Sequence, residues 1–155
     1  MAPHCEVINY VLMPNHFHFT LFVDERVLKQ VKVGNVVQSV LSAGVQRWLS
    51  GHAKGINVQQ NRTGSLFTQN TRAKLLAGPE YLRTCFHYLH QNPWKANLVS
   101  LMEQWPYSSF SDYAGLRAGS LSNQVLARQL VEINFDRFYQ ESYESINPDL
   151  LRGIW

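Results

Sequence analysis

The sequence predicts an α+β fold, in which an antiparallel β hairpin near the start of the chain is followed by several helices. The first observation is a β-branched and aromatic run from Cys5 to Val23, interrupted by the turn-forming residues Pro14-Asn15. The second is the helical spacing of apolar residues in residues 36–49 and 82–89. The third is size, since 155 residues with 45% hydrophobic content suffice for one folded core. We therefore expect a single domain.

His16 and His18 lie just past the expected turn, two residues apart at the start of the second strand. Because residues two apart on a strand point to the same face, we expect their imidazoles to lie side by side, which is half of a metal site. A His-x-His pair can equally be two half-buried imidazoles that hold no ligand. The metal interpretation therefore depends on further ligands from elsewhere in the chain.

Neither a membrane span nor a secretion signal is expected. No apolar stretch reaches 18 residues, and the segment from Met1 to Glu6 lacks the basic and then apolar pattern of a signal peptide. We therefore expect a soluble, cytoplasmic protein. Cys5 and Cys85 are too few for a disulfide framework or a Cys-based zinc site, and we expect both to be buried or incidental.

Basic residues are concentrated in the middle of the chain, although the net charge is only +3. Residues 47–95 contain seven Lys or Arg and one acidic residue, whereas residues 96–155 contain four basic and seven acidic ones. This asymmetry favours contact with a polyanion, with an ordinary solvated surface as the alternative. The seven basic residues are Arg47, Lys54, Arg62, Arg72, Lys74, Arg83 and Lys95.

Four further elements follow from local patterns. Residues 36–49 predict a helix that packs on the core, with Gly51 as its stop. Residues 65–76 predict an edge-like strand that is polar on one face. Two short helices are expected at residues 123–131 and 135–143, and the aromatic residues of the second are expected to pack on the body of the protein.

A longer helix is expected to begin at Pro79 and to be ended by Pro93. Leu82, Phe86 and Leu89 form one stripe of this helix and are expected to face the core. The pattern therefore predicts an amphipathic helix with a second face available for other contacts.

The same helix carries Tyr88 and Asn92 one turn apart on a neighbouring stripe. Without other information, Tyr88 is a boundary aromatic residue and Asn92 a cap before a proline. His87 and His90 lie on the face away from Tyr88, and we expect them at the surface or in contact with phosphate. They lack the geometry of a second metal pair.

Four segments in a fixed order resemble one known family. They are Met13–His18, Asn61–Phe67, Tyr88–Pro93 and Trp105–Phe110. From about Cys5 to Leu116, the chain resembles the single-tyrosine HUH transposases, most closely the branch of REP-associated tyrosine transposases. The resemblance implies a ferredoxin-like antiparallel sheet with helices packed on it, followed by a helical extension over residues 117–155.

The resemblance also implies a chemistry. Family members cut and rejoin single-stranded DNA through a 5′-phosphotyrosine intermediate, with no nucleotide cofactor. By position, His16, His18 and Asn92 match the metal ligands and Tyr88 matches the nucleophile. A tyrosine hydroxyl with a pKa near 10 is a poor nucleophile at neutral pH, so a bound cation supplies what the reaction lacks. Two imidazoles and one amide oxygen leave an open site that suits Mg²⁺ or Mn²⁺.

The implied partners are single-stranded or hairpin DNA and a second copy of the chain. The seven basic residues are expected to contact the DNA backbone, and Phe67, Trp94 and Tyr107 are candidates for stacking on bases. Family members normally begin with an additional strand and helix. Compared with them, this sequence is expected to be shortened at its N-terminal end. Because a missing strand leaves sheet edges unpaired, we expect a homodimer.

Three alternatives stay open at this point. A DNA-binding remnant of such a transposase would keep the fold and the basic residues without cleaving DNA. A 2H-type phosphoesterase is suggested by the H-x-T motif His18-Phe19-Thr20, but no second such motif is present in the sequence. A structural metal-binding protein would retain metal tightly and lack affinity for DNA.

Overall fold

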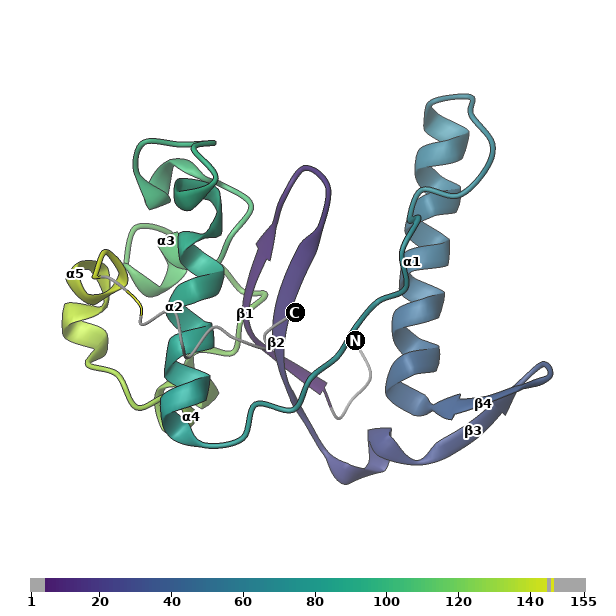
Figure 1. The fold of residues 1–155 in the computed structure, drawn as a ribbon, viewed down its shortest axis with the longest axis horizontal. Helices are drawn as coiled ribbons and strands as arrows, with labels where there is room; N and C mark the ends of the chain where they lie inside the picture. Colours follow the sequence, from purple (N-terminus) through teal and green to yellow (C-terminus); the bar gives the residue numbers. More distant parts are fainter. Residues whose placement is uncertain (1–4, 145, 147–155) are drawn as a thin grey trace. The chain divides into compact units, whose positions relative to one another are not determined.

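A computed structural model describes residues 5–144 and 146, and it confirms the α+β class (Figure 1). The chain forms two compact units, each described by itself below. We call residues 6–22 and 74 onward the hairpin unit, and residues 23–73 the basic unit. The elements are, in chain order, β1 (Cys5–Leu12), β2 (Phe17–Val23), the 3₁₀ helix η1 (Glu25–Leu28), β3 (Gln30–Val33), β4 (Val36–Ser39), α1 (Val40–Gln59), α2 (Pro79–Lys95), η2 (Met102–Gln104), α3 (Phe110–Tyr113), α4 (Gln124–Leu130), η3 (Phe135–Arg137) and α5 (Phe138–Ser142).

The predicted hairpin is present as the two-stranded sheet of β1 and β2. The amide of Met13 donates to the carbonyl of His16 over 2.8 Å, which closes the turn. A short antiparallel bridge between Val11 and Ser108 places a later segment of the chain beside β1 as well. β1 is therefore held by contacts both near and far in the sequence.

The core of the hairpin unit gathers side chains from β1, α2 and the elements that follow α2. Its buried members are Ile8, Phe86, Met102, Phe110, Tyr113, Ala127, Val131 and Phe138. The side-chain amide of Asn9 donates to the carbonyl of Phe86 over 3.0 Å and fixes α2 along β1. The predicted helices near residues 123–131 and 135–143 are present, and the prediction that the second packs on the body is confirmed by Phe138, which is buried.

The prediction of a core-packing helix over residues 36–49 is wrong in two respects. Residues 36–39 form β4 and pair with β3, because the turn at Gly34 has the positive φ of +61° that a tight hairpin needs. The helix begins after Ser39, whose hydroxyl accepts from the amide of Ser42 over 3.1 Å, and continues through Gly51. None of the 20 residues of α1, all of them described, is buried.

Two further predictions are wrong. Residues 65–76 form neither a strand nor a helix, and among the described residues no strand pairs with them. Pro93 does not end α2, which runs on to Lys95. Pro93 has no N–H to bond the carbonyl of Leu89, and the side-chain amide of Asn92 points to that carbonyl instead, at 3.5 Å.

Cys5 and Cys85 are buried and unbonded to each other, as the sequence indicated. Among the described helices, none has the length and apolar content needed to cross a bilayer.

Arg117 holds the segment 106–108 against the rest of the hairpin unit. Its guanidinium donates to the carbonyls of Pro106 and Ser108 at 2.8 and 2.7 Å, and to both carboxylate oxygens of Asp112 at 2.6 and 3.0 Å. The Asp112 side chain is 1% exposed, whereas that of Arg117 is 36% exposed. A Cβ atom on Gly119 would collide with this carboxylate, so the segment at Gly119 packs closely against Asp112.

We predict that Asp112→Ala lowers the free energy of unfolding by about 2–3 kcal/mol, because Arg117 loses the charge that orients it. Urea denaturation measures the change. Glu132→Ala removes an exposed acidic residue of the same unit and should change stability by less than about 0.5 kcal/mol. Equal losses in the two variants would contradict this role of Asp112.

The expectation that His87 and His90 lie at the surface is wrong, since they are 7% and 1% exposed. His90 lies one turn after Phe86 and shares its stripe, and α5 covers both histidines with the ring of Phe138. Hydrogen bonds satisfy one nitrogen of each ring: His87 Nδ1 to the Ser142 hydroxyl at 3.0 Å, and His90 Nε2 to the Ser109 hydroxyl at 2.8 Å. Burial lowers the pKa of His87 to about 4 and that of His90 to about 3, with a smaller contribution from Arg83 to the first and from His87 to the second.

These lowered pKa values predict an acid-sensitive fold. The unfolded chain, whose histidines have pKa values near 6.5, binds more protons than the folded chain between about pH 3 and 6.5. Stability is therefore fully present above about pH 6.5 and is lost as the pH falls, by up to about 1.4 kcal/mol per pH unit for each histidine.

Urea denaturation between pH 7 and 4.5 tests this, and the double variant His87→Asn/His90→Gln should have a flatter dependence on pH. His52→Gln changes an exposed histidine and should leave the slope unchanged. The same slope in the double variant and the wild type would contradict the assignment.

Candidate active site

His16 and His18 lie side by side, as the sequence predicted. Their ring centroids are 4.9 Å apart in an edge-to-face arrangement. His16 ends the hairpin turn and is exposed, whereas His18 is the second residue of β2 and is half-buried. Two imidazoles at this separation can approach one small cation from the same side.

The electrostatics of the pair suit a metal ligand. Burial, and then the neighbouring His16, lower the pKa of His18 to about 4, so its imidazole is neutral at neutral pH and keeps a lone pair. Asn15 Oδ1 lies 2.6 Å from His16 Nδ1 and can only accept a hydrogen bond. The hydrogen of His16 is therefore on Nδ1, which leaves Nε2 as the atom for a ligand.

Asn15 is a candidate site residue that the sequence pattern did not single out. Its turn propensity alone predicts only that it belongs to the turn. Its position directly before the first histidine was the available signal, because a short side chain there can reach the adjacent ring.

Tyr88 and Asn92 lie one turn apart on α2, and both are half-buried. β1 and α2 run in the same direction, so the hairpin turn and the C-terminal half of α2 lie at the same end of the unit (Figure 1). The Nδ2 atom of Asn92 is directed to its own helix, which leaves Oδ1 as the atom that suits a metal. All four predicted site residues thus belong to one compact unit.

Within the described residues, no group of three or more His, Cys, Asp or Glu side chains is arranged to hold a metal ion. The expected set contains two residues of these types, His16 and His18, with the Asn92 amide as the third donor. Two neutral imidazoles and an amide oxygen fit an open Mg²⁺ or Mn²⁺ site that water and phosphate oxygens complete.

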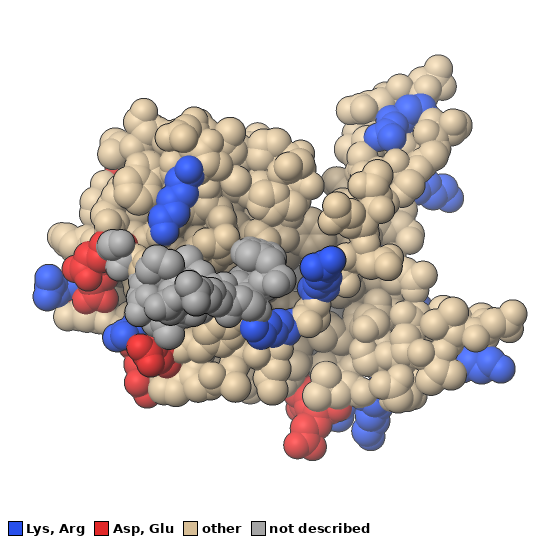
Figure 2. Space-filling model, in the orientation of Figure 1, with Lys and Arg blue, Asp and Glu red and all other residues tan. Residues whose placement is uncertain are grey.

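The seven basic residues are divided between the two units. Arg47, Lys54, Arg62 and Arg72 belong to the basic unit, and the other three to the hairpin unit. Figure 2 shows Lys and Arg side chains, and no Asp or Glu, on the upper part of the region formed by α1 and its following loop. In the hairpin unit, the ammonium of Lys74 lies over the ring of Tyr81, 5.2 Å from its centroid.

The three candidate stacking residues differ in exposure. Tyr107 is 58% exposed and is therefore accessible to a base. Trp94 packs on Tyr143 with ring centroids 5.4 Å apart, and Phe67 lies 6.3 Å from the ring of His52. Of the three, Tyr107 has the exposure that best suits stacking, since Phe67 and Trp94 are half-buried.

The chain matches no protein-family model, and no curated protein or solved structure is significantly similar to it. The interpretation of this site therefore depends on its own residues and geometry.

We predict that Mn²⁺ binds at the His16–His18 pair. His18→Ala should weaken Mn²⁺ binding more than tenfold, because it removes a ligand. Asn15→Ala should weaken binding by about tenfold, because the hydrogen of His16 is then no longer held on Nδ1. The electron paramagnetic resonance signal of free Mn²⁺ measures binding directly. His52→Ala, at an exposed histidine of the basic unit, is the control, and equal binding by all four proteins would argue against the site.

Proposed function

We propose that this chain is a divalent-metal-dependent endonuclease and strand transferase for single-stranded DNA, of the HUH transposase type, acting in the cytoplasm. The observation that carries the proposal is the pair of adjacent imidazoles at the hairpin turn, with His16 Nδ1 held by Asn15 so that its Nε2 is the atom left for a ligand. Support comes from α2, which is fixed along β1 and carries a tyrosine and an amide one turn apart.

The proposed fold around this site is a ferredoxin-like sheet of which the β1–β2 hairpin is a part. The bridge of Val11 with Ser108 is consistent with a larger antiparallel sheet around β1. A homodimer is proposed as the working assembly, and hairpin DNA as the substrate. The seven basic residues are proposed to contact the DNA backbone.

Each side chain has a distinct task in the reaction. His16 Nε2, the imidazole of His18 and Asn92 Oδ1 would hold the cation, which when bound would withdraw charge from the scissile phosphate and stabilise a phenolate. The Tyr88 oxygen forms a bond to phosphorus as its proton passes to solvent. The bond from phosphorus to the 3′-oxygen breaks, and that oxygen takes up a proton to leave as a 3′-hydroxyl.

The product is a 5′-phosphotyrosine diester. Because it replaces one phosphodiester with another, the step conserves the bond energy needed for rejoining. Attack by a 3′-hydroxyl reverses the step and joins the strands, so one site can perform both cleavage and transfer.

We predict a covalent adduct between the wild-type protein and end-labelled single-stranded hairpin DNA in Mn²⁺, stable in denaturant and absent in Tyr88→Phe. Denaturing electrophoresis detects it as a labelled band at the mobility of the protein. Tyr81→Phe alters a half-buried tyrosine two turns earlier on α2 and should leave the adduct unchanged. His18→Ala should slow adduct formation by about 100-fold or more, because the cation is lost.

Two outcomes would count against the proposal. An adduct that persists in Tyr88→Phe would assign the nucleophile to another residue. DNA binding without any adduct in Mg²⁺ or Mn²⁺ would favour a DNA-binding remnant that no longer cleaves.

A further inference from the structure

The hydroxyl of Ser109 connects the helix that carries the proposed nucleophile to the first strand of the hairpin. His90 Nε2 on α2 lies 2.8 Å from Ser109 Oγ. The same oxygen accepts from the amide of Tyr10 on β1 over 3.0 Å and lies 3.3 Å from the carbonyl of Tyr10. We call these three groups, the His90 ring, the Ser109 hydroxyl and the main chain of Tyr10, the His90–Ser109 link.

The link is buried and uses the Ser109 hydroxyl completely. Ser109 and His90 are 0% and 1% exposed. A hydroxyl has one hydrogen and two lone pairs. When His90 Nε2 and the Tyr10 amide both donate to Ser109 Oγ, the hydroxyl hydrogen is left for the Tyr10 carbonyl, and each part of the group has a partner. The contact is therefore directional, unlike the apolar contacts around it.

The link is one of two hydrogen-bonded contacts that join α2 to β1. The other is the Asn9 side-chain amide, which donates to the carbonyl of Phe86 over 3.0 Å. Phe86 and His90 are one turn apart on α2, and Asn9 and Tyr10 are neighbours on β1. One contact alone would let the helix pivot on the strand, whereas two contacts one turn apart also fix its angle.

His90 lies directly behind the proposed reacting groups of α2. It is two residues after Tyr88 and two residues before Asn92. Because each residue of an α-helix turns about 100° and rises about 1.5 Å, His90 lies on the opposite side of the helix from both, at nearly the same height. A displacement of His90 is therefore passed through the helix to Tyr88 and Asn92.

The link is costly for a contact that only fills space. The centroid of the His90 ring lies 5.1 Å from that of Phe86 and 5.5 Å from that of Phe138. His90 Nδ1 is buried and has no hydrogen-bond partner in the described part of the chain. A leucine would bury apolar surface there without leaving a polar atom unpaired. What the imidazole adds is the directed bond to Ser109.

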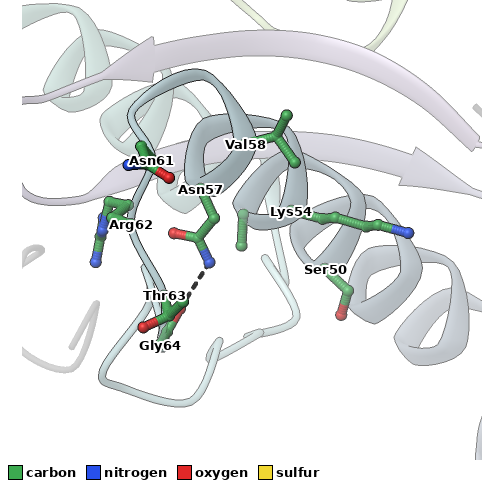
Figure 3. Close-up of a pocket in the computed structure, with 9 residues that line it drawn as sticks. Ser50, Lys54, Asn57, Val58, Asn61, Arg62, Thr63 and Gly64 are labelled. Atoms are coloured by element: carbon green, nitrogen blue, oxygen red, sulfur yellow. Dashed lines mark hydrogen bonds between the residues drawn. The ribbon is translucent and has the colours of Figure 1, made fainter.

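The link is part of packed protein rather than of a ligand site. The groove that Figure 3 shows, of about 740 Å³, lies in the basic unit between α1 and the loop that follows it. A smaller groove of about 250 Å³ lies at the hairpin turn. Neither groove is lined by His90 or Ser109. The two residues can therefore act through α2, but not by contact with a substrate.

We propose that His90 and Ser109 are positioning residues for strand cleavage. Their hydrogen bond sets the angle of α2 on β1, and thereby the place of the Tyr88 oxygen relative to the cation that the hairpin would hold. Attack on phosphorus requires close alignment of the reacting atoms, so a small pivot of the helix slows the reaction. This inference rests on the proposed function for the reaction that it serves, but the position of α2 can be measured without cleavage.

The test compares single-turnover rates of adduct formation at saturating hairpin DNA and Mn²⁺. His90→Leu and Ser109→Ala should each lower this rate by about 100-fold, because a misplacement of about 1 Å costs that much. The dissociation constant for the DNA should change by less than about threefold, since the loss occurs in the transition state. His90→Gln should recover most of the rate, because its amide reaches the position of Nε2 and can either donate or accept.

His87→Leu is the matched control. His87 is also buried on α2, and its Nδ1 lies 3.0 Å from a serine hydroxyl, but that serine, Ser142, is in α5. This variant should lose stability as His90→Leu does and keep the adduct rate of the wild type. Circular dichroism and urea denaturation define conditions in which all variants are folded. Equal slowing by the two leucine variants, or no recovery in His90→Gln, would overturn the positioning role.

A second measurement does not need cleavage. Nitroxide labels on Lys95→Cys of α2 and Phe22→Cys of β2, both at exposed positions, report the angle of α2 through their distance in double electron–electron resonance. The two native cysteines are buried. The distance distribution should shift or broaden in His90→Leu, return in His90→Gln and stay unchanged in His87→Leu. An unchanged distribution in His90→Leu would contradict the inference.

The two proposals fail in different ways. If the wild type forms no adduct in Mn²⁺, cleavage is refuted, and the label distances still decide whether the link holds α2. If the wild type forms the adduct and His90→Leu forms it equally fast, the positioning role alone is refuted.

Discussion

The packing of α2 along β1 is the contact on which the hairpin unit depends. Phe86 of α2 and Ile8 of β1 share one buried cluster. The Asn9 side-chain amide donates to the carbonyl of Phe86, and the Tyr113 hydroxyl donates to the carbonyl of Ile8. Later helices complete this cluster, since the ring of Phe138 lies against Phe86, His87 and His90. The C-terminal helices are therefore part of the same core. The apolar side chains of α2 are buried by segments that are far apart in the chain.

This packing also determines which face of α2 is available for chemistry. The stripe of Phe86 and His90 faces inward, and helical geometry then places Tyr88 and Asn92 on another face. The hairpin turn is held at its base by the indole of Trp105, which donates to the carbonyl of Leu12 over 2.9 Å. Candidate ligands and nucleophile thus stand on elements whose positions the core fixes, as catalysis by positioning requires.

The basic unit is stabilised in a different way. Its hairpin of β3 and β4 and its helix α1 are defined by local turns, caps and main-chain hydrogen bonds, and Val27 is its one buried apolar residue between residues 23 and 73. It carries positive charge with few acidic residues to balance it. A polyanion would relieve the mutual repulsion among those charges, so the proposed DNA binding would also stabilise this unit.

The sequence by itself determined the α+β class, the β1–β2 hairpin, the side-by-side placement of His16 and His18, and the apolar stripe of α2, because these follow from periods of 2 and 3.6 residues. The folded structure decided that residues 36–39 form a strand, that residues 65–76 do not, and that His87 and His90 are buried. The first depends on pairing with β3 across the turn at Gly34, and the second on the lack of a pairing strand among the described residues. The third depends on the covering helix α5, which is distant in the chain. A local pattern specifies which side chains share a face, whereas only packing decides what covers it.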